Sequence, residues 1–495
     1  MVEWTFRRDA IRSFRFVRCT LDAQTGIAQL VYAFDDGPEL VETITISGAP
    51  FFDGNDALEG DRARAAQRAL RLLHLIAGVS YYKAAVPAEI RIEGEPIDAE
   101  TAGFLHELYV SGLGEFAYRN GLDLHGRIRF PHSGESNEAA VKPSPSRGGL
   151  GGDGFHPDND DQDQTRPHPS PPLEGEGAAL GLREHALVAI GGGKDSLVSI
   201  EALRAAGVKQ TVAWVGGSQL IAACAARTGL PTLNIGRQLA PELFEFNRQG
   251  AWNGHIPVTA INSAILVLAA VLHGADQVVF SNERSASYGS TIPGTGEVNH
   301  QWSKSWAFER AFATHVHRHV ATDLHYYSLL RPLSELAVAR QFAKTDRYDA
   351  HFSSCNRNFH LLGERPASRW CGVCPKCHFV FLALAPFMPK PRLVGIFGRN
   401  LLDDPEQIAG YDALLEYRNH KPFECVGEAR ESRAALATLA ARPEWKEDAI
   451  VARFAREIQP QLDAGELRID ALLALDDEHA IPPALWERLR AHFAA

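Results

Sequence analysis

The sequence predicts an α/β protein whose core is a doubly wound parallel sheet, with an α+β domain before it and a helical region after it. Short apolar segments alternate with amphipathic ones between residues 186 and 280, as strands and helices do in such a sheet. Residues 1–131 contain segments of alternating polarity, and residues 389–495 place Leu and Ala among charges at helical spacing. The 495 residues suffice for roughly three domains.

The α+β domain is expected to occupy residues 1–131. Alternating polarity at residues 28–34 and 41–46 predicts two antiparallel strands, and Asp35-Asp36-Gly37 between them predicts a turn. Residues 62–76 carry apolar side chains at helical spacing and predict a helix.

The next segment, residues 132–182, is rich in Pro, Gly, Asp and Ser and poor in aliphatic residues. Such a composition cannot bury enough apolar area to offset the entropy lost on ordering. We therefore expect a disordered insert or linker between the α+β domain and the core.

The core is expected to span residues 183–388. Apolar runs predict strands at residues 186–190, 211–215, 232–235 and 277–280. Helices are predicted at residues 197–206, 219–227 and 259–273, each followed closely by a glycine that ends it.

Composition and charge exclude several classes of protein. The longest apolar run, residues 264–272, is far shorter than the ~20 residues that cross a membrane, and the N-terminus lacks the apolar part of a secretion signal. We expect no membrane partner and a cytoplasmic location. A formal net charge of −11 argues against a nucleic-acid partner, because phosphate contacts need a basic surface. Seven cysteines, four of them clustered late in the chain, do not fit a secreted disulfide framework. The oligomeric state stays open.

A glycine-rich loop follows the first predicted strand of the core and begins a helix. It consists of Gly191, Gly192, Gly193, Lys194, Asp195 and Ser196. Glycine backbones approach an anion closely, and a helix N-terminus adds partial positive charge. We expect Lys194 and Ser196 to contact phosphate and Asp195 to hold Mg²⁺ beside it.

The loop differs from two known phosphate loops and resembles a third. A Walker A loop would need glycine at Val188 and Ser or Thr at Asp195, and a dinucleotide loop would need glycine at Ser196. The pattern resembles the Ser-Gly-Gly-x-Asp-Ser loop of the PP-loop superfamily, with Gly191 at the first position. This resemblance implies the adenine nucleotide alpha hydrolase-like fold and cleavage of ATP to AMP and pyrophosphate. It also implies an adenine site near residues 215–217 and 234–237.

Two polar segments follow the fourth predicted strand. Glu283 and Arg284 come directly after it, where they are expected to face the ATP site, Glu283 to help bind Mg²⁺ and Arg284 to pair with phosphate or a carboxylate. A surface salt bridge is the alternative for Arg284. Residues 297–305 contain His300 and Lys304 in a dense polar set, which predicts a substrate loop.

Four cysteines have the spacing of a metal site: Cys355, Cys371, Cys374 and Cys377. Two consecutive Cys-x-x-Cys steps can wrap one ion, and the upstream cysteine completes a tetrahedron of sulfurs. The arrangement resembles the zinc site of the deazaguanine-forming relatives in the superfamily. A structural zinc is the preferred interpretation, with reduced thiols or an iron–sulfur cluster as alternatives. Cys19, Cys224 and Cys425 are interpreted as packing residues.

Several motifs together resemble one family. They read GGGKDS, SNERSAS, EVNHQWSKS, RPLSE, WCGVCPKC and KPFECVG. Outside residues 132–182, the chain resembles the MurL family of UDP-N-acetylmuramoyl-L-alanyl-L-glutamate epimerases of peptidoglycan precursor biosynthesis. The resemblance implies ATP and Mg²⁺ as cofactors and the UDP-muramoyl-dipeptide as substrate. It implies that the terminal L-glutamate is converted to D-glutamate through an acyl-adenylate.

The family's reaction needs groups that move a proton at the glutamate α-carbon. His300, Lys304 and His255 are candidate acids or bases, and Glu283 is a further candidate catalytic residue. Arg284 or Arg331 is a candidate for recognising substrate carboxylates. The alternatives are a PP-loop ligase or amidotransferase, a tRNA-modifying enzyme, and a nucleotide-sensing module that binds ATP without cleaving it.

Overall fold

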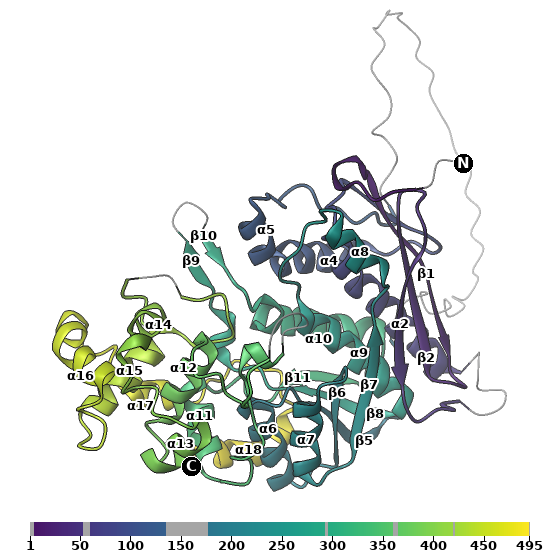
Figure 1. Cartoon of the computed structure of the whole chain (residues 1–495). Helices are drawn as coiled ribbons and strands as arrows, with labels where there is room; N and C mark the ends of the chain where they lie inside the picture. Colours follow the sequence, from purple (N-terminus) through teal and green to yellow (C-terminus); the bar gives the residue numbers. More distant parts are fainter. Residues whose placement is uncertain are drawn as a thin grey trace, which may run out of the picture.

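A nine-stranded mixed sheet runs through the molecule (Figure 1). The computed structural model describes residues 4–52, 60–134, 177–292, 296–359, 365–418 and 421–494. Five neighbouring strands are parallel, in the order β11 (His325–Ser328), β8 (Ala275–Phe280), β5 (Arg183–Ala189), β6 (Gln210–Val215) and β7 (Thr232–Gln238). The predicted α/β class with a largely parallel central sheet is confirmed.

The sheet continues into the N-terminal part of the chain. Beyond β7 come β3 (Leu40–Ile46), β2 (Ile27–Phe34), β1 (Ser13–Asp22) and β4 (Glu89–Ile92). β3 pairs antiparallel with β7, with Ile46 opposite Ile235, and β2 pairs antiparallel with β3 as predicted. The buried carboxylate of Glu42 forms an ion pair with Arg237 at 2.7 Å across this junction. The α+β segment and the core therefore share one sheet, although the domain boundaries themselves stay a prediction.

The direction of winding reverses beside β5. From β5 the chain passes through α6 (Lys194–Ala205) and α7 (Gln219–Thr228) to β6 and β7 on one side. It then passes through α9 (Val258–His273) and α10 (Trp306–His319) to β8 and β11 on the other side. At such a reversal the loops after the two central strands diverge and leave a crevice at their carboxyl ends. The fold therefore places the segments after β5 and β8 around one crevice.

Helices cover both faces of the sheet and create two hydrophobic cores (Figure 1). α9 and α10 share one core with α2 (Asp61–Ala77) and α4 (Ala99–Gly112). α9 is the most apolar of these helices, since it lies between the sheet and α2. α6 and α7 share the other core with α11 (Glu335–Ala343) and α12 (Pro375–Leu384). The helix predicted at residues 259–273 is confirmed, and Gly274 ends it in the left-handed conformation (φ 69°).

The C-terminal region packs on the second core. Among the described residues of 389–494, the chain forms helices and no strand, in agreement with the prediction. The α-helices are α13 (Lys390–Phe397), α14 (Ile408–Leu414), α15 (Ala429–Ala440), α16 (Ala449–Arg453), α17 (Ile469–Leu473) and α18 (Pro483–Ala494). α15 packs on α12 and α11, and α18 packs on α6. The C-terminal region thus supports the helix that begins at the glycine loop.

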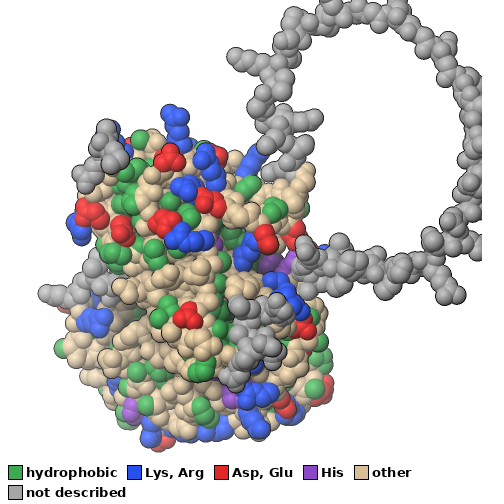
Figure 2. Space-filling model, turned by 90° about the vertical axis from the view of Figure 1, so that its right-hand side faces the viewer, with side chains coloured by type: hydrophobic (Ala, Val, Ile, Leu, Met, Phe, Trp, Pro, Cys, Tyr) green, Lys and Arg blue, Asp and Glu red, His purple; other side chains and the backbone are tan. Residues whose placement is uncertain are grey.

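Most of the predicted insert, residues 135–176, lies outside the described residues. Its last part is described and is anchored to the core: Ala178 bridges to Ala321, and the N–H groups of Leu180 and Leu182 donate to Asp323. None of the described helices is long and apolar enough to span a membrane. Figure 2 shows acidic and basic side chains interspersed on one face. The acidic residues that give the chain its net charge of −11 are therefore not gathered in a single patch on that face.

Candidate active site

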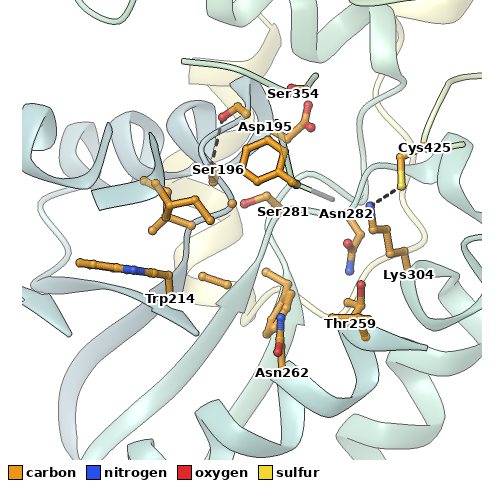
Figure 3. Close-up of a pocket in the computed structure, with 18 of the residues that line it drawn as sticks. Asp195, Ser196, Trp214, Thr259, Asn262, Ser281, Asn282, Lys304, Ser354 and Cys425 are labelled. Atoms are coloured by element: carbon orange, nitrogen blue, oxygen red, sulfur yellow. Dashed lines mark hydrogen bonds between the residues drawn. The ribbon is translucent and has the colours of Figure 1, made fainter. Parts of the chain in front are cut away.

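A cavity of about 470 Å³ lies at the carboxyl ends of β5, β6 and β8. The glycine loop, Trp214 of β6 and the segment after β8 form its walls, with Thr259 and Asn262 of α9 below (Figure 3). Segments from farther along the chain complete it through Lys304, Ser353, Ser354, Lys376 and Cys425. The predicted glycine loop and the predicted substrate loop therefore meet in one site.

The glycine loop is shaped by close contact with the segment at residues 353–354. Gly192 has a positive φ of 80°, and its carbonyl accepts a hydrogen bond from the Ser353 N–H at 2.9 Å. A Cβ on Gly193 would lie 2.7 Å from the Ser354 hydroxyl oxygen, which fills the space that any larger residue would need. Because Gly193 is also the N-cap of α6, no side chain caps the first N–H groups of that helix. The loop thus presents the features of an anion site.

Two hydroxyl groups, one in the glycine loop and one opposite it, line this part of the cavity. The Ser354 hydroxyl is buried, lines the cavity and has no hydrogen-bond partner among the described residues. Ser196 donates to the Gly193 carbonyl at 3.2 Å and also lines the cavity. A polar cradle with an unpaired donor fits a phosphate group.

Lys194 and Asp195 have different environments. The Lys194 ammonium is buried and contacts the carboxylates of Asp195 and of Glu335, the first residue of α11. It does not line the cavity, whereas Asp195 does. Burial opposes the ionisation of Asp195, but the ammonium groups of Lys194, Lys376 and Lys304 outweigh it and lower the pKa of that carboxyl. Asp195 is therefore an anion facing the cavity, as a Mg²⁺ ligand must be.

Glu283 lies behind the cavity wall. Its side chain is buried and does not line the cavity. Burial and the nearby carboxylates of Glu335 and Asp195 raise its pKa to about 8. A carboxyl group with this pKa is largely protonated at neutral pH, which makes it a weak Mg²⁺ ligand. The structure brings Glu283 close to Asp195 without bringing it to the cavity surface.

The two arginines proposed for substrate recognition point elsewhere. Arg284 donates to the carbonyl groups of Leu472 and Ala474 at 3.0 and 3.1 Å and does not line the cavity. Arg331 is buried and pairs with Glu309 at 2.7 Å. It also donates to the carbonyl groups of Glu283 and Lys304 at 2.8 and 2.7 Å. Arg331 therefore fixes the backbone of both predicted loops from inside the protein.

The candidate histidines His300 and His255 lie together and do not line the cavity themselves, but His300 contacts Cys425, which does. His300 contacts the carboxylate of Glu115, a residue of α5 (Gly114–Asn120), and its ring centre lies 4.2 Å from that of His255. Burial lowers the pKa of His300, but hydrogen bonds to Cys425 and Glu115 outweigh it and raise it to about 9. Burial and the neighbouring His300 lower the pKa of His255 to about 4. At neutral pH, His300 is thus a cation and His255 is neutral.

Lys304 and Cys425 face each other at this end of the cavity. The Lys304 ammonium donates to the Cys425 sulfur at 3.1 Å (Figure 3). Burial disfavours the Cys425 thiolate, but Lys304, His300 and Lys376 outweigh burial and lower the pKa of this thiol to about 5. The interpretation of Cys425 as an ordinary packing residue is therefore wrong, because this residue lines the cavity and its lowered pKa favours the thiolate.

The four predicted metal-binding cysteines come together. The sulfurs of Cys355, Cys371, Cys374 and Cys377 all lie within 4.8 Å of one another. The Cys371–Cys377 and Cys374–Cys377 sulfur pairs are 3.8 and 3.5 Å apart. A tetrahedron of ~2.3 Å zinc–sulfur bonds has edges of about 3.8 Å. These donors therefore fit a zinc ion, and they could hold one next to the Ser353–Ser354 wall of the cavity.

Several residues of the site had no signal in the sequence. Glu115 lies 185 positions from His300 and comes from the N-terminal part of the chain. Glu335 and Lys376 stand inside the RPLSE and WCGVCPKC motifs without a pattern that marks them individually, and no pattern points to Ser354. Cys425 had a weak signal, since it stands inside the KPFECVG motif.

Comparison with known proteins gives two family matches. The MurL N-terminal domain model matches residues 5–152 and 155–329, and the MurL C-terminal domain model matches residues 351–468. A UDP-N-acetyl-alpha-D-muramoyl-L-alanyl-L-glutamate epimerase of Xanthomonas oryzae pv. oryzae is 70% identical over 489 residues, 99% of each chain. Epimerases of the same name from a Micromonospora species and from Salinispora tropica are each 41% identical, covering 95% and 89% of this chain and 96% and 87% of their own.

Proposed function

The chain belongs to the MurL family, and we propose that it converts the terminal L-glutamate of UDP-N-acetylmuramoyl-L-alanyl-L-glutamate to D-glutamate. That it is an enzyme of the epimerase type follows from the 70% identity with a named epimerase over 99% of both chains. The substrate is inferred from the names of that relative and of two others.

We further propose that ATP activates the glutamate. A free carboxylate resists loss of the adjacent α-proton, because deprotonation would place a second negative charge beside the first. Transfer of AMP to the α-carboxylate removes that charge and releases pyrophosphate. The α-carbon of the acyl-adenylate can then be deprotonated and reprotonated on its other face, and hydrolysis yields AMP and the D-glutamyl product.

The arrangement of the cavity supports this sequence of steps. In Figure 3, Trp214 lies at one end, Asp195, Ser196 and Ser281 lie between, and Lys304 with Cys425 lies at the other end. We place the adenine ring against Trp214 and the phosphates at the glycine loop. Asp195 would hold Mg²⁺, which neutralises the departing pyrophosphate. The glutamate α-carbon would then lie near Lys304 and Cys425.

One observation carries the proposal: the glycine loop at the end of β5 opens into the same cavity as the ionised Cys425–Lys304 pair. A nucleotide site alone would not need a base beside the phosphates. A base alone would have no means to acidify the glutamate α-proton.

The four-cysteine cluster is proposed to bind a structural zinc. Its proposed ligands come from the segment at residue 355 and from residues 371–377, which lead into α12, and Ser353 and Lys376 of the same segments line the cavity. Zinc would therefore hold two walls of the site in register.

The test follows both halves of the reaction in heavy water. Purified protein is incubated with ATP, Mg²⁺ and UDP-N-acetylmuramoyl-L-alanyl-L-glutamate in D₂O, and AMP, pyrophosphate and deuterium at the glutamate α-carbon are measured. We expect all three, and D-glutamate after hydrolysis of the product. Release of pyrophosphate without deuterium at the α-carbon, with or without added ammonia, would show that the protein is an adenylating enzyme but not an epimerase. A glutamine or amide product would identify an amidotransferase or ligase, and ADP would exclude adenylation.

A further inference from the structure

We propose that Cys425 is the base that removes the glutamate α-proton, held ready as a thiolate by Lys304 and by a His300–Glu115 pair from the two halves of the chain. The inference rests on the proposed function. It adds a catalytic group that neither the motifs nor the names of the relatives assign.

The first step of the argument is which titratable groups reach the cavity. Among the described residues that line it, four can gain or lose a proton: Asp195, Lys304, Lys376 and Cys425. Asp195 pairs with Lys194 and faces the phosphate end. The pKa of Lys304 is raised, because the nearby thiolate and Glu283 outweigh its burial, so its amine stays protonated and cannot accept a proton. Lys376 donates to the Cys425 carbonyl. Cys425 therefore remains as the group that offers lone pairs to a proton at the end of the cavity away from Trp214 (Figure 3).

The second step is the geometry that keeps the sulfur ionised. The Lys304 ammonium donates to the sulfur at 3.1 Å. On another side the imidazole of His300 faces the sulfur, and the Glu115 carboxylate holds that ring at its Nδ1 atom. The Lys376 ammonium donates to the Cys425 carbonyl, and Glu424 is the neighbouring carboxyl group. Three cations around a half-buried sulfur favour the thiolate, as cations do for reactive cysteines in general.

The third step excludes the residues that the sequence favoured as bases. His300 is a cation at neutral pH and already shares its Nδ1 atom with Glu115. His255 does not line the cavity. Glu283 lies behind the wall and is largely protonated at neutral pH. Of these residues, His300 contacts the sulfur and is held by Glu115, so we assign His300 and Glu115 as positioning residues.

The proton transfer balances without another reactant. The thiolate lone pair of Cys425 takes the α-proton, and the electrons of the C–H bond move into the acyl group as an enolate. The negative charge thus passes from the sulfur to the acyl oxygen. The Lys304 ammonium, which contacts the sulfur at 3.1 Å, supplies positive charge beside the transfer. A proton delivered from water to the opposite face gives the D-isomer, and the thiol returns its proton to solvent.

The experiment separates adenylation from proton exchange. Cys425→Ser and Cys425→Ala are compared with the wild-type protein and with Cys19→Ser, a control at a half-buried cysteine of β1 outside the cavity. Each is given ATP, Mg²⁺ and the UDP-muramoyl-dipeptide in D₂O, with hydroxylamine to trap the adenylate. We expect pyrophosphate release within a few-fold of wild type and α-deuteration slower by at least about 100-fold in both Cys425 variants. Cys19→Ser should match the wild type in both.

Three outcomes would overturn the inference. One is α-deuteration at the wild-type rate in Cys425→Ala. Another is loss of pyrophosphate release together with deuteration in a folded variant, since Cys425 would then act before the proton step. A third is a substrate adduct on Cys425 in quenched wild-type protein, which would make it a nucleophile. Failure of the proposed function is distinct, because the wild-type protein itself would then release no pyrophosphate or show no α-deuteration.

A second variant tests the positioning role and does not depend on how the Cys425 variants fold. His300→Gln keeps the sulfur but removes one cation beside it. We expect the lower limb of the pH profile of α-deuteration to move to higher pH, while trapping of the adenylate is retained. An unchanged profile would contradict the role of His300.

Discussion

Arg331 and Glu309 form a buried ion pair at 2.7 Å, and the same guanidinium holds the carbonyl groups of Glu283 and Lys304. Both side chains are almost fully enclosed. The pair therefore connects α10 with the two loops that follow β8, and its disruption should loosen the site as well as the fold.

Replacing Arg331 by Met should lower the free energy of unfolding by about 3 to 5 kcal/mol, because the Glu309 carboxylate stays buried without its partner. Denaturant unfolding followed by circular dichroism measures this change. Arg18→Met is the control: Arg18 pairs with Glu39 at the surface, where loss of an ion pair changes stability little because solvent screens it. Equal effects of the two substitutions would contradict the structural role of Arg331.

Replacing Asp195 by Asn should reduce pyrophosphate release by at least about 100-fold, because the cavity loses the anion proposed to hold Mg²⁺. Lys194 retains its contact with Glu335, so the melting temperature should change little. The control is Asp61→Asn, an exposed carboxylate of α2. Activity close to wild type in Asp195→Asn, at limiting Mg²⁺, would refute the magnesium role.

Trp214 provides a test of where the nucleotide base lies. Trp214→Ala should raise the KM for ATP by roughly 10- to 100-fold with a smaller change in kcat, because stacking of a base on an aromatic ring contributes about 1–3 kcal/mol. Initial rates of pyrophosphate release at varied ATP give both constants. Trp252→Ala, outside this cavity, should leave the KM unchanged. A fall in kcat alone would place the ring elsewhere.

Alkylation should report the ionisation of Cys425 directly. The thiol has a pKa of about 5, so the reactive thiolate is present above that pH and is lost as the pH falls through it. The rate of iodoacetamide labelling at Cys425, mapped by mass spectrometry, should therefore be half-maximal near pH 5, against about 8.5 for an ordinary cysteine. Burial raises the pKa of Cys19 to about 11, which makes it the internal control. Lys304→Met should shift the labelling curve to higher pH. An unshifted curve would show that Lys304 does not lower the pKa of Cys425.

The cysteine cluster should contain zinc. We expect one zinc per chain by elemental analysis of protein prepared without chelator. Cys374→Ser should lose the metal and lower the melting temperature, whereas Cys19→Ser should keep both. Iron in the elemental analysis, together with visible absorption, would identify an iron–sulfur cluster in place of the proposed zinc. Absence of any metal would favour reduced thiols.

The elements predicted best are those with a local signal. The helix at 259–273 has an unbroken apolar pattern and a terminal glycine, and the structure places α9 at Val258–His273. The strand predicted at 277–280 lies within β8 (Ala275–Phe280) and ends at the same residue. In contrast, β11 has only the four residues HYYS, which is too short to show an alternation of polar and apolar residues. It lies at the edge of the sheet and pairs only with β8. The joining of β3 to β7 had no local signal, since pairing between strands far apart in sequence depends on tertiary packing.

The same distinction holds for the site. The glycine loop and the four cysteines were found because their residues lie close in sequence and in a pattern that chemistry demands. The Glu115–His300–Cys425 arrangement was not found, because its three members come from α5, the 297–305 segment and the 421–427 segment. The environment that changes Cys425 from a packing residue to a thiolate exists only after folding.

The junction between β3 and β7 also constrains how the chain is made. Residues 43–46 pair with residues 235–238, which leave the ribosome roughly 190 residues later. At ordinary rates of synthesis this interval is roughly 10 to 40 s, during which β3 is an open sheet edge. Its inward-pointing Glu42 has no Arg237 to pair with until then, and an unpaired charge on an edge discourages pairing with other chains. The Glu42 carboxylate that joins β3 to β7 in the finished sheet thus also discourages the nascent chain from pairing with other chains before Arg237 has been made.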